Sequence, residues 1–185
     1  MNTDTLRAER EHLANLLEAL QRCSYFLNSA ASAIDWPIDG PSLKRRQKDQ
    51  PLFQALAACN ERFSKMQDTI AAAMRHSALL MGEATTPFLR VLAFFEKLHV
   101  IESVESWQLC RAARNLAAHD YETSYDLIAE HFNELHALQR VLVEAAERLI
   151  QLCAQSLDVH PATDDFQVEF MQVCRQFASR RPTAG

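Results

Sequence analysis

The segment PLFQALAACNERFSKMQDTIAAAMRHSALLM, residues 51–81, decides the fold class. Its apolar residues recur at steps of three and four, which is the spacing of one face of an α-helix. Asp49 precedes the segment as a candidate N-cap, Pro51 suits a first helical turn, and Gly82 suits a helix end. The pattern therefore predicts a long helix with one apolar seam, formed by Leu52, Leu56, Cys59, Phe63, Met66, Ile70, Ala73, Ser77 and Leu80.

The same periodicity recurs on both sides of this segment. Thr123 or Ser124 is the expected cap of a second long helix, and Thr163 is the expected cap of a helix near the C-terminus. The latter helix carries three phenylalanines, which favours docking on the bundle over a free partner-binding element. We predict an all-α, antiparallel helical bundle with an extra C-terminal helix. The predicted helices cover residues 4–34, 51–81, about 87–99, 104–118, about 124–157 and about 163–180.

Length and composition agree with a single helical domain, residues 1–185. Hydrophobic residues make up 48% and charged residues 23% of the chain, and only three glycines are present, which disfavours a β-rich fold. The formal net charge of −5 argues against a broadly basic, duplex-binding surface. No signal peptide or membrane-length apolar run is evident, so a cytoplasmic protein with no membrane partner is expected.

Cysteine usage points to the same compartment. The five cysteines are scattered, odd in number and contain no C-x-x-C pair. This distribution predicts free, mostly buried thiols in a reducing cytoplasm. They are Cys23, Cys59, Cys110, Cys153 and Cys174.

A short basic run follows the first predicted helix. Pro37, Gly40 and Pro41 break that helix, and residues 35–50 are predicted to form a basic linker. Four of the five residues 44–48, KRRQK, are cationic. The favoured interpretation is a solvated linker; the functional alternative is a mobile arm that contacts an RNA backbone.

The octet RNLAAHDY, residues 114–121, is the stretch that indicates chemistry. It closes the helix predicted over residues 104–118, for which two stripes are distinguished. Leu109, Ala112, Ala113 and Leu116 form the expected core face. A second stripe mixes apolar, amide and cationic residues, which suits a partner surface, and consists of Val104, Trp107, Arg111, Asn115 and Ala118. The plainer alternative is that Trp107 shields the edge of the core and His119 only finishes the helix.

The octet resembles the R-x4-H-x-Y signature of the HEPN superfamily, in particular HEPN toxins paired with minimal nucleotidyltransferase (MNT) antitoxins. Arg114, Asn115, His119 and Tyr121 match the motif, with Ala118 as the small residue before the histidine. The position of the motif late in one helix, before another long helix, also matches. The resemblance covers a core of about residues 51–157, and implies an HEPN-like bundle.

The resemblance also implies a function. Two copies of the motif are expected to meet across a homodimer interface and to form a composite, metal-independent RNA-cleaving site without a cofactor. His119 would be the acid or base, Arg114 would clamp phosphate, and Asn115 and Arg111 would support them. Tyr121 matches the tyrosine that MNT partners modify with AMP in some pairs, which would place bulk and negative charge beside the cleft.

Three functional hypotheses remain open from sequence. The leading one is an endoribonuclease toxin of a prokaryotic toxin–antitoxin or phage-defence system, with RNA as substrate and an MNT-type antitoxin as partner. The second is a non-catalytic HEPN subunit that binds a nucleotidyltransferase or its nucleotide. The third is a helical interaction module in which the octet is coincidental.

A dimetal bundle is the rival constellation. Glu9 and His12, and Glu96 and His99, form two Glu-x-x-His pairs of the kind that such bundles use. Glu96 lies off the apolar seam of its helix, so it is not expected to project inward. No metal ligand is therefore predicted.

Overall fold

The computed structural model describes residues 3–116 and 124–179, and within these residues it contains seven helices and no strand. The predicted all-α bundle is confirmed. The helices are α1 (Thr3–Ser32), α2 (Gly40–Arg45), α3 (Gln50–Leu80), α4 (Phe88–Lys97), α5 (Val104–Leu116), α6 (Tyr125–Leu157) and α7 (Gln167–Ser179).

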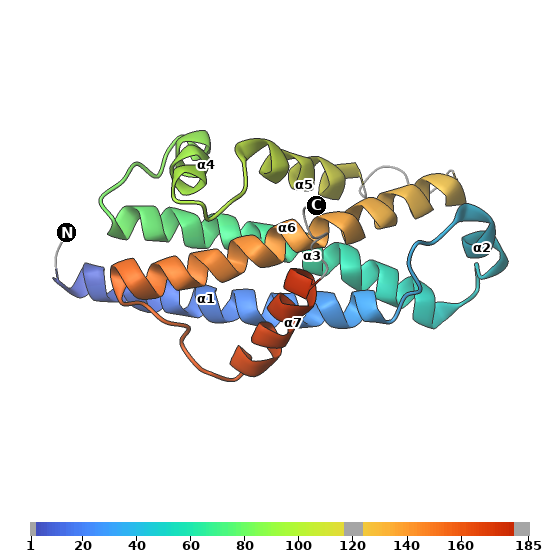
Figure 1. The fold of residues 1–185 in the computed structure, drawn as a ribbon, viewed down its shortest axis with the longest axis horizontal. Helices are drawn as coiled ribbons and strands as arrows, with labels where there is room; N and C mark the ends of the chain where they lie inside the picture. Colours follow the sequence, from blue (N-terminus) through green and yellow to red (C-terminus); the bar gives the residue numbers. More distant parts are fainter. Residues whose placement is uncertain (1–2, 117–123, 180–185) are drawn as a thin grey trace.

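The three longest helices, α1, α3 and α6, pack along the length of the molecule (Figure 1). The chain reverses direction between α1 and α3, returns through α5, and reverses again into α6. The short helices α4 and α5 cover α3, whereas α7 crosses α1 and α6. α2 lies at the end of the bundle where α6 begins. α1 and α3 are therefore antiparallel, as expected. α6 runs parallel to α3, because α4 and α5 carry the chain back along the bundle between them; Phe63 lies near Phe132, and Ser77 near Cys153.

Local sequence signals set several helix ends. The Asp49 carboxylate accepts a hydrogen bond from the Leu52 amide at 3.1 Å, and Ser124 Oγ accepts one from the Asp126 amide at 3.3 Å. Gly82 follows α3 with φ of +77°, a left-handed conformation that glycine adopts without a Cβ penalty. The predicted signals at Asp49, Ser124 and Gly82 are thus confirmed.

The cap predicted at Thr163 is wrong. Thr163 Oγ1 accepts a hydrogen bond from the Asp165 amide, while α7 starts only at Gln167. A tight turn, in which the Gln167 amide donates to Asp164 O at 3.1 Å, separates the two. The threonine therefore stabilises the turn and not the first turn of the helix.

The core is a continuous apolar seam between the long helices. Phe63, Phe95 and Phe132 are among its largest fully buried side chains. In α7, Phe170 and Phe177 are 5% exposed, so the helix is docked on the bundle as predicted. Within the described residues, no helix combines the length and the apolar character needed to cross a bilayer.

All five cysteines are free and buried, as predicted. Burial raises the pKa of the Cys59 and Cys153 thiols to about 11, and of the Cys110 and Cys174 thiols to about 12. Burial also raises the pKa of Cys23. Because the thiolate is the nucleophile, none of these residues is poised for thiol catalysis at neutral pH.

The faces of α5 differ from the prediction. Trp107 is 3% exposed and Cys110 and Ala113 are fully buried, whereas Leu109 is 50% exposed and Ala112 is also exposed. The prediction of Leu109 and Ala112 as core residues is therefore wrong, whereas Ala113 is buried as predicted. Of the two alternatives for Trp107, the structure confirms that the indole shields the core and contradicts its place on a free partner surface. The physical reason is area: burying the indole removes more apolar surface from water than burying a leucine.

Residues 35–50, expected to be a linker, contain α2. Asp39 caps this helix, accepting a hydrogen bond from the Ser42 amide at 2.7 Å. Leu43 is 1% exposed and anchors the helix to the bundle. Asn133 of α6 binds both the amide and the carbonyl of Ile38, at 3.0 and 2.8 Å. The segment is thus a docked element of the fold.

Candidate functional site

The structure describes only some of the site residues predicted from sequence. Arg111 and Arg114 lie on α5 and are described in full. Asn115 belongs to α5, but its side chain lies outside the description. His119 and Tyr121 lie outside the described residues, so the structure gives no geometry for the complete octet.

Arg111 and Arg114 line one open pocket of about 230 Å³ between α3, α4 and α5. They are three residues apart, so their side chains leave α5 on nearly the same side. Arg111 is exposed and forms no ion pair with a described residue. The pocket therefore offers a guanidinium that pairs with no described carboxylate, beside a second one that is partly buried.

Arg75 of α3 is a third cation of the same pocket, and sequence reasoning missed it. Its guanidinium carbon lies 4.2 Å from the centroid of the Phe88 ring, a cation–π arrangement. Phe88 opens α4, so this contact joins two helices that are adjacent only in the folded chain. A guanidinium stacked on a ring keeps its edge available to a planar anion.

Asp68 balances part of this charge. Its carboxylate forms an ion pair with Arg114, and the two side chains are 63% and 25% exposed, respectively. An ion pair this open to solvent contributes only about 0–1 kcal/mol. An incoming phosphate can therefore replace the carboxylate at small cost.

Gln67 forms part of the inner wall of the pocket. The residue is 3% exposed, and its Nε2 donates to Trp107 O at 3.2 Å, which ties α3 to α5. Its Oε1 is buried and has no hydrogen-bond partner among the described residues. Because buried acceptors are normally satisfied, a ligand hydroxyl or amide would find an acceptor here.

The Glu-x-x-His pairs do not assemble with each other. Glu96 Oε1 accepts a hydrogen bond from the Val104 amide at 3.1 Å, so it stabilises the start of α5. Glu9 instead lies 2.7 Å from His76 Nδ1, a pairing between α1 and α3 that sequence spacing did not indicate. No group of three or more metal-binding side chains occurs within residues 3–116 and 124–179.

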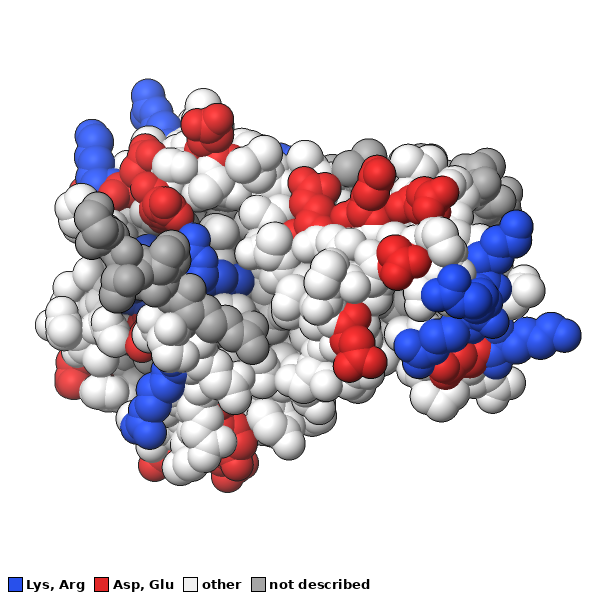
Figure 2. All heavy atoms as spheres, turned by 45° about the vertical axis from the view of Figure 1, so that its right-hand side comes forward, with Lys and Arg blue, Asp and Glu red and all other residues white. Residues whose placement is uncertain are grey.

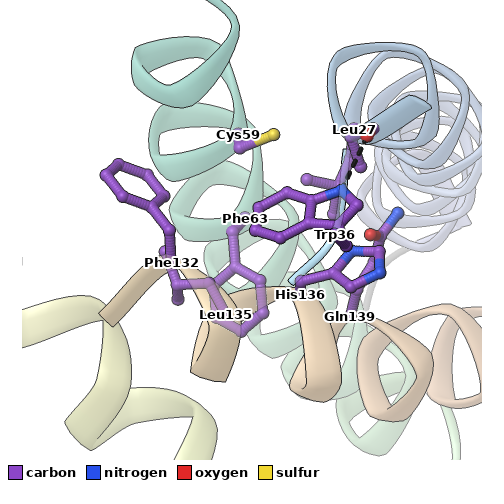
Figure 3. Close-up of a pocket in the computed structure, with 9 residues that line it drawn as sticks. Leu27, Trp36, Cys59, Phe63, Phe132, Leu135, His136 and Gln139 are labelled. Carbon is purple, nitrogen blue, oxygen red and sulfur yellow. Dashed lines mark hydrogen bonds between the residues drawn. The ribbon is translucent and has the colours of Figure 1, made fainter. Parts of the chain in front are cut away.

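A second hollow lies between α1, α3 and α6. There Trp36 stacks on His136 with ring centroids 4.2 Å apart, and its indole N–H donates to Ala31 O at 2.8 Å (Figure 3). Leu27 and Phe63 lie on the same small apolar pocket. These contacts fasten the chain after α1 to α6, and this hollow has none of the cationic character of the arginine pocket.

The sequence matches no family model, and no match was found among curated proteins or among solved structures. The resemblance to HEPN proteins consequently rests on the motif residues. The described part of the chain contributes a pocket lined by three arginines, a lining whose positive charge suits an anion.

Proposed function

We propose that this chain is an endoribonuclease toxin of a toxin–antitoxin or phage-defence system, acting as a homodimer without a catalytic metal. The observation that supports this proposal is the arginine pocket, defined by Arg75, Arg111 and Arg114. Two of its three cations stand on α5, and Arg114 is also the first residue of the R-x4-H-x-Y motif.

The chemistry needs few groups. A base removes the proton from the ribose 2′-OH, the oxygen attacks the adjacent phosphorus, and an acid protonates the leaving 5′-oxygen. His119 is the candidate for either proton transfer, since imidazole titrates near neutral pH. Arg114 and Arg111 would stabilise the charge that develops on the phosphate oxygens.

One copy of the motif supplies only one histidine, which is why the proposal includes a dimer. The exposed face of α5, with Leu109 at 50% exposure and Ala112 beside it, is the surface we assign to this contact. Both side chains are small enough or apolar enough for close helix packing. The buried Trp107 takes no part in it.

The dimer can be tested with one substitution. Leu109→Glu is expected to convert a dimer into a monomer, because it places a charge in a desolvated contact. Sedimentation velocity measures the mass, and circular dichroism reports whether the helices persist. Leu89→Glu is the matched control, since Leu89 is 60% exposed on α4. A Leu109→Glu protein whose mass equals that of the wild type would contradict this assignment.

The partner proposal concerns control of the nuclease. An MNT-type antitoxin would attach AMP to Tyr121, two residues after His119. The added phosphate would repel the RNA backbone and compete for the arginines. Neutralisation would then leave the toxin folded.

A second candidate function has support from the walls of the same pocket. Phe88 and the stacked Arg75 form a flat surface beside two further arginines, an arrangement that also suits a free nucleotide. A non-catalytic subunit that presents a nucleotide to a nucleotidyltransferase would use these groups and would not cleave RNA.

The deciding experiment is induced expression followed by an RNA assay. Growth arrest, together with cleavage of single-stranded RNA in the presence of a chelator, is expected for the nuclease. A protein that neither slows growth nor cleaves RNA, yet binds ATP in an Arg111-dependent manner, would favour the nucleotide-binding subunit. Cleavage that stops on chelation would refute metal independence.

Substitution of Asp68 is expected to raise ligand affinity, whereas most substitutions in a binding site lower it. Asp68→Asn removes the carboxylate that pairs with Arg114, so affinity for a phosphate ligand is expected to rise about fivefold, corresponding to about 1 kcal/mol. Titration calorimetry with pyrophosphate measures it. Asp164→Asn, far along the chain on the turn before α7, is the control. A lower affinity in Asp68→Asn would show that the carboxylate positions Arg114.

A further inference from the structure

The basic end of the bundle is a preformed surface. We define the α2 platform as Lys44, Arg45, Arg46 and Lys48, all of which are exposed. Figure 2 shows basic side chains gathered at the end of the molecule where α2 lies. The chain as a whole carries a net charge of −5, so this local excess of positive charge is set against an acidic background.

The platform is held in place by contacts beneath it. Asp39 and Asp49 cap α2 and α3, Leu43 is buried, and Tyr125 Oη donates to Gln47 Oε1 at 3.4 Å. A Cβ at Gly40 would overlap the side chain of Asp126, which shows how closely the start of α2 approaches α6. Cations on a docked element lose less conformational entropy on binding than cations on a free arm.

Most of this charge is uncompensated. Arg46 pairs with Asp49 at 2.7 Å, but Lys44, Arg45 and Lys48 form no ion pair with any residue that the structure describes. Unpaired cations at a fixed spacing are suited to successive phosphates of a nucleic-acid backbone. A membrane surface is less suitable, because the apolar residue Leu43 points inward and no apolar side chain stands among residues 44–48 to insert into lipid.

The arginine pocket lies beside α5, and the platform lies beside the start of α6, the next helix of the chain. α5 carries Arg111 and Arg114 and runs toward the end of the molecule at which α2 lies (Figure 1). α6 begins at Tyr125, whose Oη donates to Gln47 Oε1; Gln47 lies between Arg46 and Lys48 of the platform.

We infer that the substrate is an extended single-stranded RNA whose backbone is held by the α2 platform while another of its phosphates occupies the arginine pocket. This inference rests on the proposed function. It adds that the chain recognises a stretch of RNA and not a mononucleotide, and that affinity depends on length. The platform acts on the backbone, so it contributes affinity and register without reading base sequence.

The test is a triple variant, Lys44→Gln, Arg45→Gln and Lys48→Gln, which leaves both helix caps intact. Binding of 2′-O-methyl RNA, which resists cleavage, is measured by fluorescence anisotropy for lengths of roughly 4 and roughly 16 nucleotides. The variant is expected to bind the short RNA like the wild type. For the long RNA, its log–log salt slope should be smaller by about 2, so that raising salt from about 50 to about 200 mM costs about 20-fold less affinity than in the wild type.

Arg7→Gln, Arg22→Gln and Lys97→Gln together form the matched control, because these three exposed cations lie outside both the platform and the arginine pocket. Equal slopes for the wild type and the α2 variant on long RNA would overturn the inference, while RNA cleavage by both would leave the proposed function standing. A platform-dependent slope without cleavage would uphold the inference and refute the nuclease. Platform-dependent binding to phosphatidylserine vesicles but not to RNA would overturn the inference in favour of a membrane surface.

Discussion

RNA cleavage by the His119→Ala protein is expected to fall by about 10²- to 10⁴-fold, the range that a positioned acid or base contributes. Growth inhibition should disappear with it. The imidazole is the only group of the motif that can both take and give a proton near neutral pH. Arg114 and Arg111 remain in this variant, so affinity for uncleavable RNA should change little. The rate constant for cleavage under single-turnover conditions is the quantity to measure.

His160→Ala is the matched control for this prediction. The His160 side chain is 67% exposed and its nearest acidic partner, Asp158, lies 3.6 Å away after the end of α6. Its loss should leave cleavage and growth inhibition unchanged. A His119→Ala protein with wild-type activity would remove the nuclease assignment, because the proposed mechanism depends on His119 for proton transfer.

The sequence predicted those parts of the fold that depend on neighbours along the chain. The seam of α3, its cap at Asp49 and its stop at Gly82 each follow from interactions within a few residues. The α6 cap at Ser124 has the same origin. The miss at Thr163 is also local in nature, because a turn and a first helical turn compete for the same hydroxyl.

The features that could not be predicted depend on which helices meet. Arg75 and Asp68 belong to the polar face of α3 in any helical projection, and only the docking of α5 makes them part of a pocket with Arg111 and Arg114. The docking of α2 could not be predicted for the same reason, because Asn133, which anchors the chain just before α2, is far away in the sequence. From sequence alone, a short stretch with prolines and four cations predicts a solvated linker, because the contact with Asn133 is not evident.

The orientation of α5 shows most directly how two apolar stripes of one helix compete to face the core. Two stripes of this helix contain apolar residues, and periodicity alone favoured the stripe with Leu109 and Ala112, which the structure leaves exposed. The structure buries Trp107, Cys110 and Ala113, and leaves Leu109 exposed. This choice turns Arg111 and Arg114 toward the pocket, so the tryptophan indirectly positions the candidate site.

The stability of the protein should therefore depend strongly on Trp107. Trp107→Ala is expected to lower the free energy of unfolding by about 3–5 kcal/mol, since it deletes a large buried ring and leaves a cavity between α3, α4 and α5. Leu109→Ala, two positions along the same helix, should change it by no more than about 0.5 kcal/mol. Urea unfolding followed by circular dichroism measures both variants against the wild type.

The comparison separates the two faces of α5 because both substitutions produce the same residue in the same helix, so intrinsic helix propensity contributes little to the difference. A larger loss for Leu109→Ala would mean that α5 buries the opposite face, and the arginine pocket would then not exist as described. The two variants also bear on the dimer. If Leu109 lies in the contact between two copies, the cost of Leu109→Ala should grow with protein concentration, whereas the cost of Trp107→Ala should persist at concentrations where only monomer is present.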